Sequence, residues 1–245
     1  MLRRRKRTAA RFLAASPESR RRSGPRWPGR IRAWRPKVKP ILIVLLAVLA
    51  GGPALAQAPE TAPYAKTLFA RLHPEDQGLA RGWQEGLAGL LDTVRESSDD
   101  PETLDAIPQF LALAEAPHLP FALAELEGDW RMRSLQATDY GAFIYQYFPA
   151  RIYPEGDAYV FDKNSGSQRH RGLLAQKDDT SAFFVGALYY GYEAPRLYSA
   201  MTVGETTPEQ REFDAVAEIY KIGEAHFLMA FAPEDGRYRL YEIRK

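Results

Sequence analysis

The second half of the chain is a series of short aromatic and β-branched segments separated by tight-turn sequences. The turns PEGD (154–157), KNSGS (163–167), QKDDT (176–180), IGEA (222–225) and PEDG (233–236) contain the Gly, Asn, Asp and Pro residues that hairpins require. The pattern predicts strands at 129–136, 142–153, 157–162, 168–176, 181–190, 196–201, 215–222, 226–232 and 237–243. Eight or nine such strands form an antiparallel meander, and closing it into a barrel removes its exposed edges.

The preceding segment, residues 57–125, has helical periodicity. One apolar stripe is formed at three- and four-residue steps by Leu79, Trp83, Leu87, Leu90, Leu91 and Val94. We expect this helix to begin near Pro74, because proline fits the first helical turn. A second helix is expected after Asp100 as its N-cap, with Pro108 breaking or kinking it.

A short turn-rich stretch, TTPEQREFD (206–214), interrupts the strands. Thr207 and Gln210 fit the two ends of a capping box, which predicts a single helical turn. Such a turn lies either across one barrel end as a lid or in a solvated loop between two strands.

Residues 1–56 have the organisation of a basic leader and a secretory signal. The uncharged run ILIVLLAVLA (41–50) follows Lys37 and Lys39 and precedes Ala54-Leu55-Ala56, an A-x-A cleavage site. The run is shorter than the roughly 20 apolar residues of a membrane-spanning helix. We predict cleavage after Ala56 and a periplasmic mature protein. An uncleaved anchor with a basic cytoplasmic arm is the alternative.

Charge is divided sharply along the chain. Residues 1–40 hold fifteen of the 33 Lys and Arg residues and one of the 31 acidic residues, so the rest holds 18 basic and 30 acidic residues. The leader is longer than an ordinary n-region, which favours a true translation start near Val38; a twin-arginine export route also stays open. A nucleic-acid-binding tail is disfavoured, because export removes it and the acidic remainder repels phosphate. We expect membrane contact only through the signal segment before cleavage.

The chain has no cysteine. This excludes disulfides, thiolate metal sites, cysteine nucleophiles and a lipid-modified cysteine. Stability must come from an ordinary core, which the chain beyond residue 56 is long enough to form.

The first predicted strand begins with Gly128-Asp129-Trp130, a G-x-W motif entered from a helical segment. This placement resembles the lipocalins and related calycin barrels. The resemblance implies that Trp130, with Gly128, closes one barrel end and that a late arginine packs over the indole; Arg237, Arg239 and Arg244 are the candidates by position. The chain departs from classical lipocalins in its long helical preface and in lacking their later motifs and disulfides.

Several motifs in order give a closer resemblance. The order of GDWRMRSLQ, the YFPARIY segment, KNSGSQRHRGLL and GYEAPRLY is similar to an alphaproteobacterial exported family catalogued as a domain of unknown function, numbered forty-eight ninety-three. The resemblance implies an exported protein and brings no assigned activity or catalytic residue. We therefore predict an α+β fold with three parts: a leader and signal (1–56), a helical segment (57–125), and a lipocalin-like antiparallel barrel of eight or nine strands (126–245).

The strongest candidate binding sequence is SGSQRHRG (165–172). On a strand, Arg169 and Arg171 share one face while Gln168 and His170 share the other. Two guanidinium groups about 7 Å apart can grip a carboxylate or phosphate. The alternative is a solvated hairpin whose arginines balance nearby acids. His170 completes this set of candidate ligand residues.

Tyrosines of the predicted strand 142–153 are further candidates. Phe143, Tyr145 and Tyr147 share one face by alternation, opposite Ile144 and Phe148. Tyr145 and Tyr147 are candidate ligand residues, because hydroxyls turned inward would make a polar cavity. A barrel filled by its own aromatic side chains is the alternative.

No catalytic motif is present. The four histidines at 73, 118, 170 and 226 lack metal-site spacing, His73 and His118 lie in Pro-bounded turns typical of surfaces, and no known nucleophile, phosphate-loop or dinucleotide motif occurs. We expect a non-enzymatic protein with no cofactor or metal that binds a small amphipathic or anionic ligand. The alternatives are a structural or protein-interaction component of the envelope with a filled barrel and, third, a hydrolase with an unrecognised site.

Overall fold

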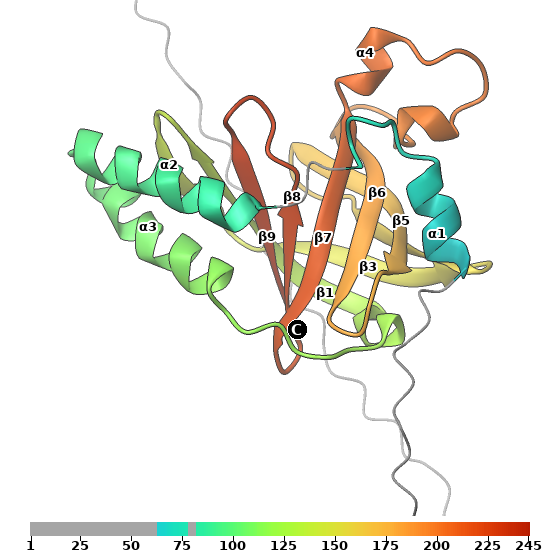
Figure 1. The fold of residues 1–245 in the computed structure, drawn as a ribbon, viewed down its shortest axis with the longest axis horizontal. Helices are drawn as coiled ribbons and strands as arrows, with labels where there is room; N and C mark the ends of the chain where they lie inside the picture. Colours follow the sequence, from blue (N-terminus) through green and yellow to red (C-terminus); the bar gives the residue numbers. More distant parts are fainter. Residues whose placement is uncertain (1–62, 78–81) are drawn as a thin grey trace, which may run out of the picture. The chain divides into compact units, whose positions relative to one another are not determined.

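The computed structural model describes residues 63–77 and 82–245, and its central feature is a closed antiparallel barrel (Figure 1). Strands pair in the order β2-β1-β3-β4-β5-β6-β7-β8-β9, and β1 also pairs with β9. Eight strands therefore close the barrel, within the predicted eight or nine, and β2 is an extra strand. The strands are β1 Gly128–Thr138, β2 Gly141–Ile144, β3 Phe148–Glu155, β4 Ala158–Lys163, β5 Gln168–Gln176, β6 Ser181–Tyr190, β7 Asp214–Gly223, β8 His226–Phe231 and β9 Tyr238–Arg244. The predicted leader, signal peptide and cleavage point lie outside the described residues.

A β-bulge separates β2 from β3. Met132 pairs with Phe148, whereas Leu135 pairs with Ile144, so three residues (145–147) lie opposite two (133–134). The extra residue reverses the alternation of side chains between the two faces of the sheet. The prediction of one uninterrupted strand over 142–153 is therefore wrong.

The bulge also changes which residues share a face. Phe143 pairs with Gln136 and shares its inner face, whereas the Tyr147 hydroxyl reaches Glu242 on the outer face. Phe148 lies inside and Ile144 outside, beside the helices. The predicted common face of Phe143 and Tyr147 is thus wrong, because simple alternation assumes a regular strand.

The barrel interior has an apolar end and a polar end. Leu126, Trp130, Ile219 and Phe227 pack at the apolar end, beside the short helix η1 (Leu123–Leu126). Rings of Phe161, Phe184 and Phe231 form the middle layer. Gly172 and Gly186 face each other across β5 and β6, and a Cβ on either would collide with the Phe184 ring. Beyond that layer the inward side chains are polar: Gln136, Lys163, Gln168, His170, Arg239 and Tyr241.

Helices cover two parts of the outer wall (Figure 1). α2 (Trp83–Ser97) and α3 (Pro101–Ala114) pack on outward residues of β1, β2, β8 and β9. α1 (Pro63–Ala70) packs on β5, β6 and β7. The sequence of β6 is almost continuously apolar, because this strand is buried on both faces.

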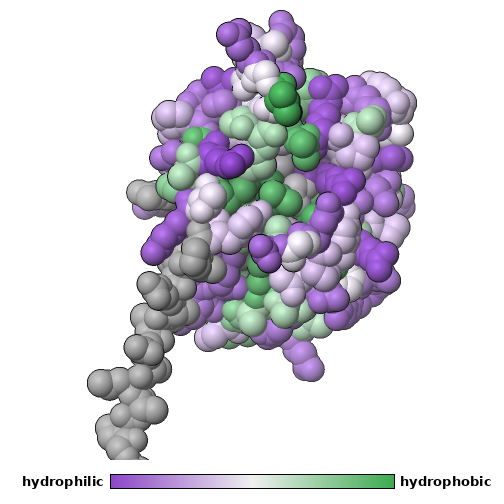
Figure 2. Space-filling model, turned by 90° about the vertical axis from the view of Figure 1, so that its right-hand side faces the viewer, coloured by the Kyte–Doolittle hydropathy of each residue, from purple (hydrophilic) through white to green (hydrophobic). Residues whose placement is uncertain are grey.

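Apolar surface gathers in patches on the face that carries α1 (Figure 2). A groove there is lined by apolar side chains of α1 and the neighbouring strands, among them Ala65, Phe69, Leu72, Phe183 and Val216. Phe69 keeps 40% of its surface exposed, so α1 covers this wall only in part.

The predicted helices form, with differences at their ends. α2 begins at Trp83, after Gly82 in the left-handed conformation, and not at Pro74. Leu79 lies outside the described residues. α3 has Asp100 as N-cap, as predicted, with its carboxylate accepting from the Thr103 N–H at 2.9 Å.

Pro108 lies inside one continuous α3, so the predicted break into two helices is wrong. Proline removes one helical hydrogen bond and costs about 3 kcal/mol in a helix interior. Burial of Ile107, Phe110 and Leu113 against the barrel offsets that cost.

The predicted strand at 196–201 is also wrong. This segment has no strand pairing and ends in a 3-10 helix, η2 (Ser199–Met201). Pro195 lacks the N–H that a ladder requires, and Tyr198 packs under α1 instead. Within the described ranges, no helix is long and apolar enough to cross a membrane.

Candidate functional site

A cavity of about 400 Å³ opens at the polar end of the barrel. His170 of β5 and Arg239 of β9 lie at its inner side, and Leu188, Ala215 and Phe231 supply apolar wall. Its rim carries both charge signs, including Asp76, Arg211, Glu212, Asp214, Glu234 and Arg237. The cavity is amphipathic, with a basic inner side and a mixed rim.

His170 is fully buried and has both ring nitrogens engaged. The Arg239 Nη1 lies 3.2 Å from His170 Nε2, and the Tyr241 hydroxyl lies 2.7 Å from Nδ1. A guanidinium only donates, so Nε2 must accept and Nδ1 must carry the proton. Burial lowers the pKa of His170 well below its ordinary value of 6.5, and Arg239 and Lys163 lower it further. The imidazole is neutral.

This tautomer leaves interior donors without acceptors. Because His170 Nδ1 donates to Tyr241, the Tyr241 hydroxyl hydrogen must find another acceptor, and no described residue supplies one. Arg239 Nε is buried and also has no hydrogen-bond partner. Each buried polar group left unpaired costs about 1 to 3 kcal/mol.

The interior cations at the polar end have no carboxylate partner among the described residues. Arg239 and Lys163 form no ion pair there; Lys163 Nζ donates to the Ser165 and Gln168 carbonyls at 2.7 and 2.6 Å. Burial lowers the pKa of Lys163 to about 8, with Arg169 and Arg239 contributing. The polar end therefore presents an excess of donors and positive charge.

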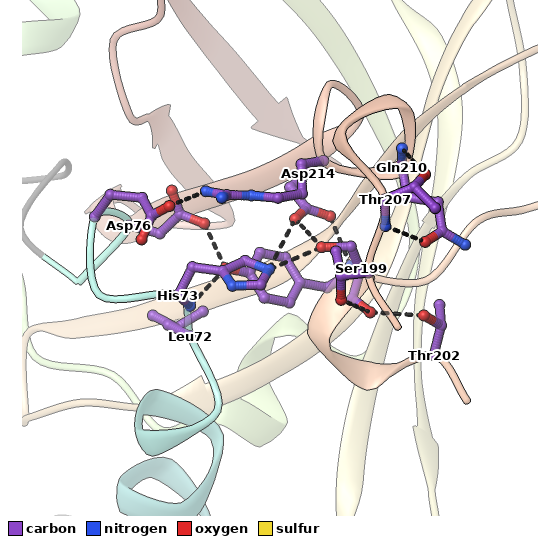
Figure 3. A network of polar contacts seen from close by, with 12 residues as sticks. Leu72, His73, Asp76, Ser199, Thr202, Thr207, Gln210 and Asp214 are labelled. Atoms are coloured by element: carbon purple, nitrogen blue, oxygen red, sulfur yellow. Dashed lines mark hydrogen bonds and ion pairs between the residues drawn. The ribbon is translucent and has the colours of Figure 1, made fainter. Parts of the chain in front are cut away.

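A network of polar contacts adjoins the rim of the cavity (Figure 3). His73 Nε2 lies 2.9 Å from Ser199 Oγ, and the Asp214 carboxylate accepts from the Ser199 N–H at 2.6 Å and from its hydroxyl. The Tyr198 hydroxyl donates to Asp76 and accepts from the His73 N–H. These contacts join residues 73–76 to η2 and β7.

The Ser199, His73 and Asp214 side chains do not have the order of a catalytic triad. The Ser199 hydroxyl has one proton, which it gives to Asp214, so His73 donates to Ser199 instead of accepting from it. Ser199 is also 1% exposed. Burial raises the pKa of Asp214, and hydrogen bonds from Ser199 partly offset the rise. We call this network, which joins residues 73–76 to η2 and β7, the clasp; within it the His73 side chain is partly buried and 19% exposed.

The helical turn predicted near residue 207 is α4 (Pro208–Arg211), with the expected capping box of Thr207 and Gln210. Pro208 and Arg211 line the cavity, which places α4 at its mouth. Arg211 also pairs with Glu75, beside the clasp.

Arg169 and Arg171 lie on the outer face of the barrel, opposite Gln168 and His170, as the alternation predicts. Arg169 donates to the Gly166 carbonyl at 3.0 Å. Arg171 donates to the Tyr153 hydroxyl at 3.1 Å and lies 3.7 Å from Glu155. The structure does not bring either arginine to the cavity, and an anion-binding role for them stays a prediction.

Tyr145 and Tyr147 lie in the bulge, away from the cavity lining. Tyr145 is 47% exposed. The Tyr147 hydroxyl donates to Glu242 at 2.8 Å, and the Arg133 guanidinium lies over its ring. Glu242 itself is fully buried on the outer face, with Arg133, His226 and Arg244 as further partners.

Trp130 is buried in the interior at the apolar end, and its indole N–H donates to the Leu126 carbonyl at 2.6 Å. Gly128, two residues earlier, has φ +126°, a conformation that side chains rarely adopt. The cation over the Trp130 ring is Lys245, 4.6 Å from the centroid, and not one of the three arginines expected there.

Sequence reasoning missed Arg239 as the interior cation. The available signal was its spacing: Arg239, Tyr241 and Ile243 share one face of β9, where an arginine among apolar residues is unusual. Within the described ranges, no group of three His, Asp or Glu side chains is placed to hold a metal ion.

Comparisons with known proteins bear on the family alone. A comparison with curated proteins gives no match. Among solved structures, a redesigned beta barrel aligns with 53% of this chain and 98% of its own, at 10% identity and a TM-score of 0.32, which carries no argument for the fold. The family model described as Domain of unknown function (DUF4893) matches residues 70–234, from the end of α1 to the turn before β9. Since that span exceeds half of the sequence, the chain belongs to the DUF4893 family.

Proposed function

We propose that this barrel protein binds a small anionic or amphipathic molecule in its polar-end cavity, without catalysing a reaction on it, and does so in the periplasm. The observation that carries the proposal is Arg239. Its guanidinium lines the cavity, has a buried Nε without a partner, and forms no ion pair with a described carboxylate.

An anionic group bound at Arg239 would remove this energetic cost. A partly buried charge without a counter-charge costs free energy, and a carboxylate or phosphate oxygen supplies both the charge and the missing acceptor. His170 would position the guanidinium through the 3.2 Å contact to Nη1, leaving the remaining donors for the ligand.

The cavity's size and walls support a small amphipathic ligand. About 400 Å³ falls within the range of roughly 300 to 1,000 Å³ typical of small-molecule sites. Leu188, Phe213 and Phe231 supply apolar wall between the basic inner side and the rim. The acids of the rim, Glu212 and Glu234, favour an orientation with the anionic group inward.

Binding is favoured over catalysis because three titratable groups at the cavity, His170, Asp214 and Asp76, are already engaged. Both ring nitrogens of His170 have partners, Asp214 accepts twice from Ser199, and Asp76 accepts from Tyr198. A general base needs an unoccupied acceptor within reach of substrate. At the apolar end the barrel is filled by its own side chains, which favours the alternative of an envelope scaffold. The cavity at the polar end does not favour that alternative.

Native mass spectrometry of the protein purified from its own periplasm tests this function. The expected result is a mature chain starting at Gln57 with a reproducible small-molecule adduct that is absent from Arg239→Gln. A clean apo mass in repeated preparations would contradict ligand binding and favour the scaffold. A chain that retains residue 40 would contradict cleavage and the periplasmic assignment.

A further inference from the structure

The apolar groove under α1 adjoins the polar-end cavity, because Asp76 and Val216 line both spaces. The cavity extends from Arg239 at its inner side to these two residues at its rim. From them the groove continues over the outer wall, between α1 and the strands β6 and β7. The cavity and the groove are therefore neighbours across Asp76 and Val216.

The groove has a volume of about 230 Å³ and offers mainly apolar contacts. Its lining residues Leu72, Phe183 and Val216 are 5%, 6% and 9% exposed, so the space among them is narrow. Phe69 is 40% exposed and meets the Phe183 ring edge-on, with 6.3 Å between the centroids. It belongs to the face on which apolar patches gather (Figure 2). An apolar occupant would bury the rest of the Phe69 ring, which is favourable.

Polar groups of the lining already have partners or can stay in water. At the boundary with the cavity, the Asp76 carboxylate accepts from the Tyr198 hydroxyl. Lys177 pairs with Glu218. Lys66 is exposed, so its ammonium can remain in water while its methylene stem covers apolar surface. An apolar chain in the groove therefore displaces none of these interactions.

The charges of the cavity decide which end of a ligand reaches the groove. The rim acids Glu212 and Glu234 favour an orientation with the anionic group inward, at Arg239. The rest of the molecule then points to the rim. There Val216 joins the apolar wall of the cavity to that of the groove.

We propose that the ligand is an anionic amphipath with a single hydrocarbon tail, which passes Val216 and lies in the groove under α1. The inference rests on the proposed function, since it names the class of ligand that the same cavity holds. Its head binds Arg239, and its tail contacts Phe69 and Leu72. Each methylene group buried in the groove raises the affinity by up to about fourfold, until the groove is filled.

A chain-length series tests the proposal on the full mature chain. The probes are straight-chain alkanesulfonates of four to twelve carbons, each below its micelle concentration, with dissociation constants from amide NMR titrations. We expect affinity to rise with chain length and then to level off. Arg239→Gln should weaken all members by a similar factor, because it removes the partner of the head group.

A groove variant separates the tail from the head. Phe69→Gln should weaken the twelve-carbon sulfonate by at least about fivefold, because its tail then meets a polar side chain. The four-carbon sulfonate should bind this variant unchanged, which also shows that the variant folds. Leu104→Gln, at an α3 residue 37% exposed, is the matched control and should change neither constant.

Nuclear Overhauser effects locate the end of the tail. The terminal methyl group of the twelve-carbon probe should show them to the Phe69 ring and the Leu72 methyl groups. Effects to Leu188 or Phe231 instead would place the tail inside the barrel and overturn the assignment.

The remaining outcomes separate this inference from the proposed function. Binding that depends on Arg239 but not on chain length, or a chain-length gain that persists in Phe69→Gln, would overturn the groove assignment and leave the anion site. A series that binds equally with and without Arg239 would overturn both. A concentration-dependent dimer that buries Phe69 would assign the groove to a second copy of the chain.

Discussion

The guanidinium Nη1 of Arg239 lies 3.2 Å from Nε2 of His170, a contact between a cation and a fully buried imidazole. Because arginine cannot accept, the contact requires a neutral imidazole with its proton on Nδ1. The same contact places the guanidinium at the inner side of the polar-end cavity.

His170 should therefore keep one tautomer and stay neutral through mild acid. Its pKa is well below the ordinary 6.5 because of burial, Arg239 and Lys163. The unfolded chain takes up a proton near the ordinary value and the folded chain does not, so this group's contribution to stability is complete above that value and declines as pH falls below it.

Nitrogen-resolved NMR of the imidazole checks the protonation state. The Nδ1 and Nε2 shifts should be unchanged from about pH 8 to about pH 5. Titration of His170 within that window would contradict the assignment. His118, which is only partly buried, provides an internal comparison in the same spectra.

Glu242 should be a large contributor to stability. It is fully buried, and Arg133, Arg244, Tyr147 and His226 surround it. Glu242→Gln leaves two guanidinium groups without their counter-charge and should cost about 3 kcal/mol or more in the free energy of unfolding. Chemical denaturation measures the change.

A matched control and a pH series sharpen that prediction. Glu155→Gln, at an exposed pair with Arg171, should change stability by less than about 1 kcal/mol. Burial raises the pKa of Glu242, but hydrogen bonds from Tyr147 and Arg133 outweigh burial and hold it below the ordinary 4.5. Its contribution is present above that value and is lost as pH falls through the folded pKa. Equal effects of the two variants would contradict the account.

Trp130→Ala should cost about 3 to 5 kcal/mol, because it removes the largest side chain at the apolar end and its hydrogen bond to Leu126. Tyr192→Ala, at a residue 86% exposed, should stay within about 0.5 kcal/mol of the unmutated protein. Urea denaturation of both variants checks the difference. A near-neutral Trp130→Ala would overturn its assignment as a core residue.

Ser199→Ala should loosen the clasp beside the cavity. It removes the hydroxyl between His73 and Asp214 and leaves a buried carboxylate with one fewer donor, at a cost of about 1 to 3 kcal/mol. Thermal unfolding should show the loss, and Ser97→Ala, at an exposed position on α2, should show little. If the variant abolished an esterase activity while keeping stability, the clasp would be a catalytic site.

The fold was largely predictable because turn chemistry and alternation are local. The residues at 163–167 and 233–236 favour hairpin turns through their own conformational preferences, independently of the rest of the chain. Alternation likewise separated His170 from Arg169 correctly. It does not reveal which face is inside, since helices bury the outer wall too and both faces of several strands are apolar.

The site was less predictable because it depends on long-range pairing. Arg239 and His170 are 69 residues apart and meet only when the barrel closes. The bulge before Phe148 is set by pairing with β1, so alternation carried through it gave the wrong face for Tyr147. Pro108 shows the same limit, because the barrel supplies the packing that keeps α3 continuous.

The most direct test is the dissociation constant of an anionic amphipathic probe, anilinonaphthalene sulfonate, for three forms of the mature protein. Arg239→Gln removes the interior cation, and Arg169→Gln removes one on the outer face. We expect Arg239→Gln to weaken binding by about tenfold or more and Arg169→Gln to leave it unchanged, since a charge-assisted contact contributes about 1.5 to 3 kcal/mol. Equal binding by the unmutated protein and Arg239→Gln, or a loss confined to Arg169→Gln, would contradict an anion site inside the barrel.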